Sequence, residues 1–183
     1  MKKLLITALL VATPGMSQAA VNLIHNGGFE SPVQASGTWA IYDNIADWNT
    51  LAGVGVEVRN NVVGSAHSGN NFVELDSVSN GWIAQSFATI EGQDYNLSFW
   101  YSPRAGQKAN TNGIEAYIND DLQLSLTSTG VGHSGNTWSL HSLTFTAGAG
   151  PLTTLSFFAA GNSDSLGGSL DDVSVTAVPE PET

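Results

Sequence analysis

Short alternations of apolar and polar residues run through nearly the whole chain, and no stretch keeps an apolar spacing of three and four residues. Val54, Val56 and Val58 alternate with small or charged residues, for example. A period of two is typical of a β-strand with one buried face. Similar runs occur at 72–76, 96–101, 114–119, 139–146, 152–158 and 169–176. Because glycine, asparagine and serine separate them, the sequence predicts an all-β chain of roughly ten strands.

Strands with one apolar face must bury it against a second layer, which predicts an antiparallel two-sheet β-sandwich of the jelly-roll type. Trp39, Trp48 and Trp138 lie near presumed strand ends and are predicted to be in the core. Gln85 falls between apolar residues of a presumed inner face, so we expect it to hydrogen bond backbone groups where strands diverge.

The first nineteen residues have the pattern of a secretory signal peptide. Lys2 and Lys3 precede an apolar run over 4–12, and small residues follow as far as Ala19. The run is too short for a permanent membrane anchor. We therefore predict cleavage near Ala19 or Ala20 and an exported single domain over residues 20–177.

The charge is strongly acidic. Loss of Lys2 and Lys3 with the signal leaves Arg59, Arg104 and Lys108 against sixteen acidic residues, a net charge of −13. Such a surface disfavours nucleic acid as a partner and favours divalent cations. The chain has no cysteine, so disulfides and thiolate metal sites are excluded.

Residues 178–183 read Val-Pro-Glu-Pro-Glu-Thr. This resembles the start of the PEP-CTERM sorting signal, by which some Gram-negative bacteria that make exopolysaccharide hand exported proteins to an exosortase. The apolar helix and basic cluster that complete the signal are not in this sequence. The tail is thus expected to belong to a truncated or lost anchor, with exosortase processing if truncated. The alternative is an ordinary proline-rich tail.

Three segments share a family pattern. They are Asn22–Glu30 (NLIHNGGFE), Ala66–Leu75 (AHSGNNFVEL) and Gly168–Val175 (GSLDDVSV). Together they resemble the opening, middle and closing motifs of galactose-binding-like modules, including the choice-of-anchor C family and xylan- and glucan-binding modules. The runs Tyr101–Gly106 and Asn112–Tyr117 are also similar to a segment of large calcium-dependent bacterial adhesins. The resemblance implies a galactose-binding-like jelly roll and a role at the cell surface.

A calcium site is the first candidate. Asp171 shares strand parity with Val173 and Val175, so its carboxylate is expected to face the interior, where few basic residues could pair it. In the modules that this chain resembles, a structural calcium ion joins the opening segment to the closing strand. The resemblance implies Glu30, Asp171 and main-chain oxygens around Ser68 and Asn71 as ligands. The alternative is that both carboxylates accept backbone amides and bind no metal.

A sugar-binding surface is the second candidate. If alternation holds, Trp82, Trp100 and Tyr117 point away from the core, with Arg104 and Glu115 as polar neighbours. Exposed rings stack on the C–H-rich faces of sugars while polar groups bind hydroxyls. The alternative is that loops cover these rings and form a second small core.

Catalysis has little support in the sequence. The four histidines have no metal-ligand spacing, and no G-x-S-x-G motif occurs. Asp120 and Asp121 follow Asn119, a context that favours a hairpin turn over a glycosidase pair. We therefore predict a non-catalytic carbohydrate-binding protein with structural calcium, located at the cell surface or in an exopolysaccharide matrix. The alternatives are a structural or adhesive matrix protein without a sugar site and, less favoured, a glycoside hydrolase.

Overall fold

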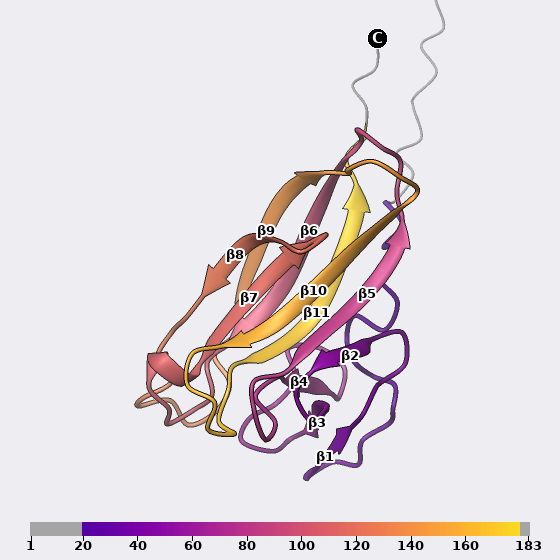
Figure 1. Ribbon diagram of the computed structural model, residues 1–183. Helices are drawn as coiled ribbons and strands as arrows, with labels where there is room; N and C mark the ends of the chain where they lie inside the picture. Colours follow the sequence, from indigo (N-terminus) through magenta and orange to yellow (C-terminus); the bar gives the residue numbers. More distant parts are fainter. Residues whose placement is uncertain (1–19, 180–183) are drawn as a thin grey trace, which may run out of the picture.

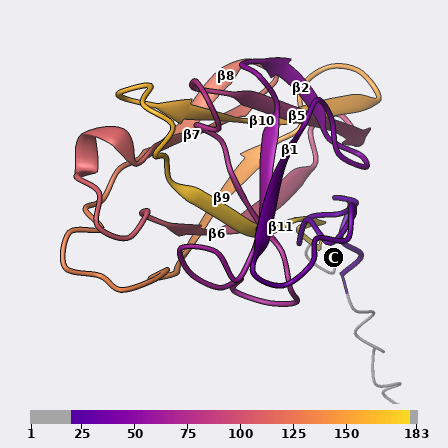
Figure 2. The same cartoon turned by 90° about the horizontal axis from the view of Figure 1, so that it is seen from below.

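The computed structural model describes residues 20–179, and these form two antiparallel sheets packed face to face (Figure 1). Seen from below, one layer contains β2, β5, β10, β7 and β8, and the other contains β6, β9 and β11 (Figure 2). The prediction of an all-β, two-sheet antiparallel sandwich is confirmed. The predicted signal peptide and residues 180–183 of the predicted sorting tail lie outside the described residues.

The larger sheet has six strands in the order β1-β3-β4-β11-β6-β9. Their bounds are Thr38–Tyr42 (β1), Val56–Asn60 (β3), Phe72–Glu74 (β4), Ser169–Ala177 (β11), Asp94–Ser102 (β6) and Ser139–Thr146 (β9). The closing strand β11 therefore lies in the middle of the sheet, between β4 and β6.

The smaller sheet has five strands in the order β2-β5-β10-β7-β8. Their bounds are Asn49–Ala52 (β2), Trp82–Ala88 (β5), Leu152–Ala160 (β10), Gly113–Ile118 (β7) and Asp121–Leu126 (β8). A short 3-10 helix over Ala109–Thr111 precedes β7. Asn119 and Asp120 connect β7 to β8 with φ values of 50° and 68°, the pattern of a two-residue type I′ hairpin turn. The prediction of a hairpin turn at this point is confirmed.

The core lies between the sheets, where the predicted inner faces meet. Leu97, Phe99, Ile114 and Ala116 are all at most 1% exposed. Trp48 is also buried, as predicted, and packs on Phe29 at a ring-centroid distance of 5.6 Å. The period of two therefore identified the buried faces correctly on these central strands.

Two other tryptophans do not follow the prediction. Trp39 is 54% exposed, because it lies on the outer face of the edge strand β1, opposite Arg59. Trp138 is half-buried in the segment before β9, where it packs edge-on against Phe72 on the outer side of the larger sheet. A position near a strand end thus did not decide whether a ring enters the core.

Gln85 satisfies backbone groups, as predicted. Its Oε1 accepts a hydrogen bond from the amide of His25 at 2.8 Å, and its Nε2 donates to the carbonyl of the same residue at 2.9 Å. The side chain therefore acts like an additional strand that pairs with the N-terminal segment. Within residues 20–179, no helix has the length and apolar character needed to cross a membrane.

Candidate functional site

An aromatic cluster occupies the outer face of the five-stranded sheet. Trp82 on β5 lies directly opposite Phe158 on β10, and their ring centroids are 5.7 Å apart. Tyr117 on β7 comes within 5.6 Å of Trp82, with the two rings tilted by 36°. All three rings are half-buried. We call Trp82, Tyr117 and Phe158 the aromatic platform.

Small residues beneath the rings make this approach possible. Ser156 on β10 pairs with Ala84 on one side and Tyr117 on the other, and both small residues are at most 5% exposed. Because β10 is the central strand of this sheet, rings from β5 and β7 meet across it. The platform is therefore built by three neighbouring strands and does not depend on a loop.

Glu115 supplies the polar neighbour of the platform. It lies beside Phe158 in the register, and its Oε2 accepts a hydrogen bond from the Tyr117 hydroxyl at 2.5 Å. This hydrogen bond raises the pKa of Tyr117, so the phenol stays protonated and remains the donor. Oε1 of Glu115 accepts no hydrogen bond from the described residues. The carboxylate can therefore accept a bond from a ligand.

The orientation of Trp82 decides which part of its ring meets solvent. Its Nε1 atom is buried and has no hydrogen-bond partner among residues 20–179, although the side chain as a whole is half-buried. The exposed part of the ring is consequently its hydrocarbon part. Such a surface can stack on an apolar face, but it offers no indole N–H to a ligand.

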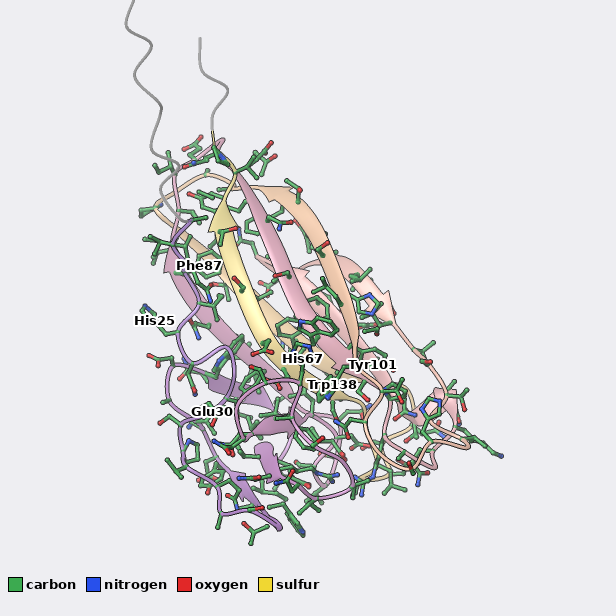
Figure 3. All side chains as sticks on the ribbon, turned by 180° about the vertical axis from the view of Figure 1, so that it is seen from behind. His25, Glu30, His67, Phe87, Tyr101 and Trp138 are labelled. Carbon is green, nitrogen blue, oxygen red and sulfur yellow. The ribbon has the colours of Figure 1, made fainter. Side chains whose placement is uncertain are left out.

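Trp100 lies on the other sheet and is not part of the platform. It projects from the outer face of β6, opposite Asp171 of β11. His67 covers it, with ring centroids 3.6 Å apart and planes only 15° from parallel. Trp138 packs edge-on against the same histidine, and both labelled residues lie over this face in Figure 3. A loop thus covers Trp100, which is the alternative that the sequence left open.

Arg104 belongs to a buried ion-pair network on the same outer side. Its Nη1 lies 2.7 Å from both carboxylate oxygens of Glu74, which is fully buried. Arg59 contacts Glu74 at 3.0 Å and Glu57 at 2.6 Å. Burial raises the pKa of Glu74 to about 7, although the two arginines oppose this shift. Arg104 is therefore held within this network, away from Trp82, Tyr117 and Glu115.

Asp171 is fully buried, but the expected direction of its side chain is wrong. Between Asp171 and Ser174 the register with β6 shifts by one residue, and Asp172 takes a φ of 48°. This β-bulge reverses the alternation, so Asp171 is on the outer face while Val173 and Val175 face the core. Parity counted along the sequence cannot detect an added residue of this kind.

The Asp171 carboxylate fixes the loop that covers Trp100. Its Oδ2 accepts the amides of His67 at 2.8 Å and Ser68 at 3.3 Å, while Oδ1 accepts the amide of Asp172 at 2.7 Å. Burial, with the neighbouring Asp172 charge, raises the pKa of Asp171 to about 7. The Asp172 carboxylate binds the same loop through His67 Nδ1 at 2.5 Å and Ser68 Oγ at 2.6 Å.

The predicted calcium ligands lie around this loop. Oε1 of Glu30 accepts the amides of Asn70 and Asn71 at 2.7 and 2.9 Å, and Gly69, at a φ of 61°, lets the loop approach this carboxylate closely. Asn71 is buried, and its Oδ1 has no hydrogen-bond partner in the described part of the chain. An unpartnered amide oxygen beside a carboxylate fits a calcium ion in donor type. Asp171 fits less directly, because its oxygens already accept three amides.

Sequence reasoning missed Phe158, which completes the platform. The run 152–158 was predicted as a strand, but its two faces were not assigned. The adjacent residues Phe157 and Phe158 carried the signal, since a strand must send them to opposite faces. In the structure Phe157 is fully buried and Phe158 is half-buried on the outside.

One pocket of the structure lies elsewhere. It has a volume of about 520 Å³ and is bounded by apolar residues near both ends of the described chain, including Val21, Ile90, Tyr95 and Val178. None of its lining residues belongs to the platform. The platform lies on the outer face of the five-stranded sheet and is separate from this pocket.

Comparison with known proteins finds a matching family model and structures with the same fold. Residues 22–176 match a family model described as a protein of unknown function, DUF642. No curated protein sequence matches the chain. The structure is similar to that of the Stig cyclase Fisc from Fischerella sp. TAU in complex with (3Z)-3-(1-methyl-2-pyrrolidinylidene)-3H-indole, with a TM-score of 0.64, 18% identity, and coverage of 89% of this chain and 100% of that chain.

Two further structures have the same architecture. TmCBM61 in complex with β-1,4-galactotriose aligns with a TM-score of 0.60 and 18% identity over 87% of this chain and 100% of that chain. The K1 cleaved adhesin domain of Lys-gingipain from Porphyromonas gingivalis W83 aligns with a TM-score of 0.54 and 18% identity over 78% and 98%. At these identities the similarity establishes a shared fold, that of carbohydrate-binding-module jelly rolls, and nothing about a shared ligand.

Proposed function

We propose that this chain, which belongs to the DUF642 family of proteins of unknown function, is an exported, non-catalytic module that binds polysaccharide outside the cell. The observation that carries the proposal is the aromatic platform of Trp82, Tyr117 and Phe158 with Glu115 at its edge. Aromatic rings on an outer sheet face can stack on the C–H faces of sugars, and a free carboxylate oxygen accepts hydroxyl hydrogen bonds. The fold similarity to carbohydrate-binding modules is consistent with this use.

The position of the platform on an outer sheet face favours a polymer as the ligand. Small molecules are usually held in concave sites that bury most of their surface. A single sugar on an outer sheet face with three rings would bury little of its own area. An extended polysaccharide can instead place successive residues along the sheet and sum several weak contacts.

Alanine variants of the platform test the proposal. Trp82→Ala and Phe158→Ala should each weaken binding to a neutral exopolysaccharide by about tenfold in affinity electrophoresis, since one stacking contact is worth about 1.4 kcal/mol. Trp100→Ala is the matched control, because its ring lies on the opposite sheet beneath His67 and should not affect binding.

Stability separates a binding role from a structural one. Phe157→Ala, which empties a core position beside the platform, should cost about 3 to 5 kcal/mol of stability. Phe158→Ala should lower the melting temperature much less. If both platform variants bind like the wild type, the chain is better described as a structural or adhesive matrix protein without a sugar site.

Export and the cofactor belong to the same proposal. Mass spectrometry of protein recovered outside the producing cells should give an N-terminus at or next to Ala20.

We also propose a structural calcium ion at the loop held by Glu30 and Asp171, with Asn71 as an oxygen donor and Ser68 contributing a main-chain oxygen. The absence of catalysis is tested by incubating the protein with the bound glycan and assaying for released reducing ends.

A further inference from the structure

The turn that connects β4 to β5 brings two polar side chains together. Asp76 and Asn80 form an isolated antiparallel bridge that closes the turn between β4 and β5. Residues directly opposite each other in such a pair project their side chains to the same face, about 5 Å apart at Cβ. The turn therefore presents a carboxylate and a side-chain amide next to each other.

Both side chains contact the loop 161–165. Oδ2 of Asp76 accepts the amides of Asp164 at 2.9 Å and Ser165 at 3.1 Å. Asn80 donates through Nδ2 to the carbonyl of Gly161 at 3.0 Å. These bonds fix both residues and leave one oxygen of each unused.

The unused oxygens are buried. Asp76 is fully buried, and its Oδ1 has no hydrogen-bond partner among residues 20–179; the same is true of Asn80 Oδ1. No ion pair within that part of the chain involves Asp76, and Arg104, whose Nη1 lies 3.4 Å from the Ser165 carbonyl, is paired with Glu74. A buried carboxylate oxygen without donor or cation is costly.

We propose that the turn 76–80 and the loop 161–165 form a calcium site, with Asp76 Oδ1 and Asn80 Oδ1 as side-chain ligands. Calcium accepts carboxylate, amide and main-chain oxygens in loose geometry. No group of three acidic or histidine side chains that could hold a metal converges anywhere in residues 20–179. Such a site, with one carboxylate, has an affinity in the range of extracellular calcium modules, about 10⁻⁴ to 10⁻³ M.

This site is separate from the loop held by Glu30 and Asp171, and it has a consequence for the platform. The turn enters β5 at Trp82, two residues after Asn80, and the loop leaves β10 three residues after Phe158. A bound ion would therefore join the ends of the two strands that carry these rings. The site stands on its own contacts and does not depend on what the platform binds.

Terbium luminescence tests the site directly, because Tb³⁺ replaces Ca²⁺ and Trp82 lies close enough to sensitise it. Titration of the purified chain with TbCl₃ should give saturable emission on excitation of tryptophan, displaced by CaCl₂ and not by equimolar MgCl₂. Asp76→Asn should weaken Tb³⁺ binding at least tenfold and Asn80→Ala severalfold. Because the loop held by Glu30 is also proposed to bind calcium, all titrations are run in a Glu30→Gln background, so that the emission reports the Asp76 site alone.

Two variants are used so that the test does not depend on the folding of Asp76→Asn. Circular dichroism establishes whether Asp76→Asn is folded; if it is not, Asn80→Ala decides, since it leaves the Asp76 hydrogen bonds intact. Emission that is equal in Glu30→Gln alone and with Asp76→Asn or Asn80→Ala added overturns the assignment. So does the absence of calcium-displaceable emission in Glu30→Gln alone, which would mean that the two oxygens bind water only.

Discussion

Replacing Arg104 with alanine separates the two roles that this residue could have. The change removes both 2.7 Å contacts to the fully buried Glu74 and leaves Arg59, at 3.0 Å, as its one cationic partner within residues 20–179. Breaking one partner from a buried ion pair typically costs about 3 to 5 kcal/mol. For a domain of this size, 1 kcal/mol shifts the melting temperature by about 2 to 4 °C, so we expect a fall of about 6 to 20 °C.

The pH dependence of this loss provides a second readout. The pKa of Glu74 is raised from its ordinary value of 4.5 to about 7. The carboxyl is therefore charged in the folded protein at pH 8 and largely neutral at pH 5. Because Arg104 lowers this pKa, its removal raises the pKa of Glu74 further. At pH 8 the variant must therefore either keep a poorly compensated charge or take up a proton, whereas at pH 5 the carboxyl is already neutral and neither cost arises. The melting temperatures of Arg104→Ala and the wild type should differ more at pH 8 than at pH 5.

Lys108→Ala is the matched control, since it removes the same charge from an exposed side chain that forms no ion pair within the described residues. Its stability should change by less than about 0.5 kcal/mol. Both variants should retain glycan binding when assayed well below their melting temperatures. Equal melting temperatures for the two variants at pH 8, or a loss of glycan binding by Arg104→Ala with its stability intact, would refute the structural role.

Three further predictions concern charge and metal. The pKa of Asp171 is about 7 in the folded protein and 3.8 in the unfolded chain. Its contribution to stability is therefore present below about pH 4 and is lost as the pH rises through 7. In Asp171→Asn the melting temperature should depend less on pH between 4 and 7. Calcium at 100-fold excess over Kd should stabilise the protein by about 2.7 kcal/mol per site in thermal melts compared with chelator; Asp171→Ala should remove the contribution of its own loop, and a shift as large as that of the wild type contradicts a role for this residue. No DNA complex should form in a mobility-shift assay at physiological salt, whereas binding that weakens steeply with added salt would show a concentrated basic surface.

The buried faces could be predicted because they follow from local geometry. Successive side chains of a strand point to opposite sides, so Leu97 and Phe99 had to face one way and Trp100 the other. The same rule placed Trp82, Tyr117 and Glu115 outside the core. The role of the Gln85 side chain could also be predicted, because a polar residue among buried apolar ones needs a hydrogen-bond partner.

Other features of the candidate site were beyond a count along the sequence. The bulge between Asp171 and Ser174 adds one residue to β11 and reverses its faces, which no pattern of residue types marks. Trp100 is covered by His67, a residue that precedes it by more than thirty positions and reaches it through the Asp171 and Asp172 hydrogen bonds. Whether an outward ring meets water depends on such long-range contacts.

The amino-acid sequence by itself therefore determined the fold class, the inner and outer residues of the central strands and the scarcity of basic side chains, because each depends on residue type and a local period. Only the tertiary structure decided which outward rings share a surface. Trp82, Tyr117 and Phe158 meet because β5, β10 and β7 are neighbours in one sheet, while Trp100 lies on β6 of the other sheet and Arg104 in the loop that follows β6. The order of strands in a sheet is set by pairing between distant segments, and the period of two contains no information about it.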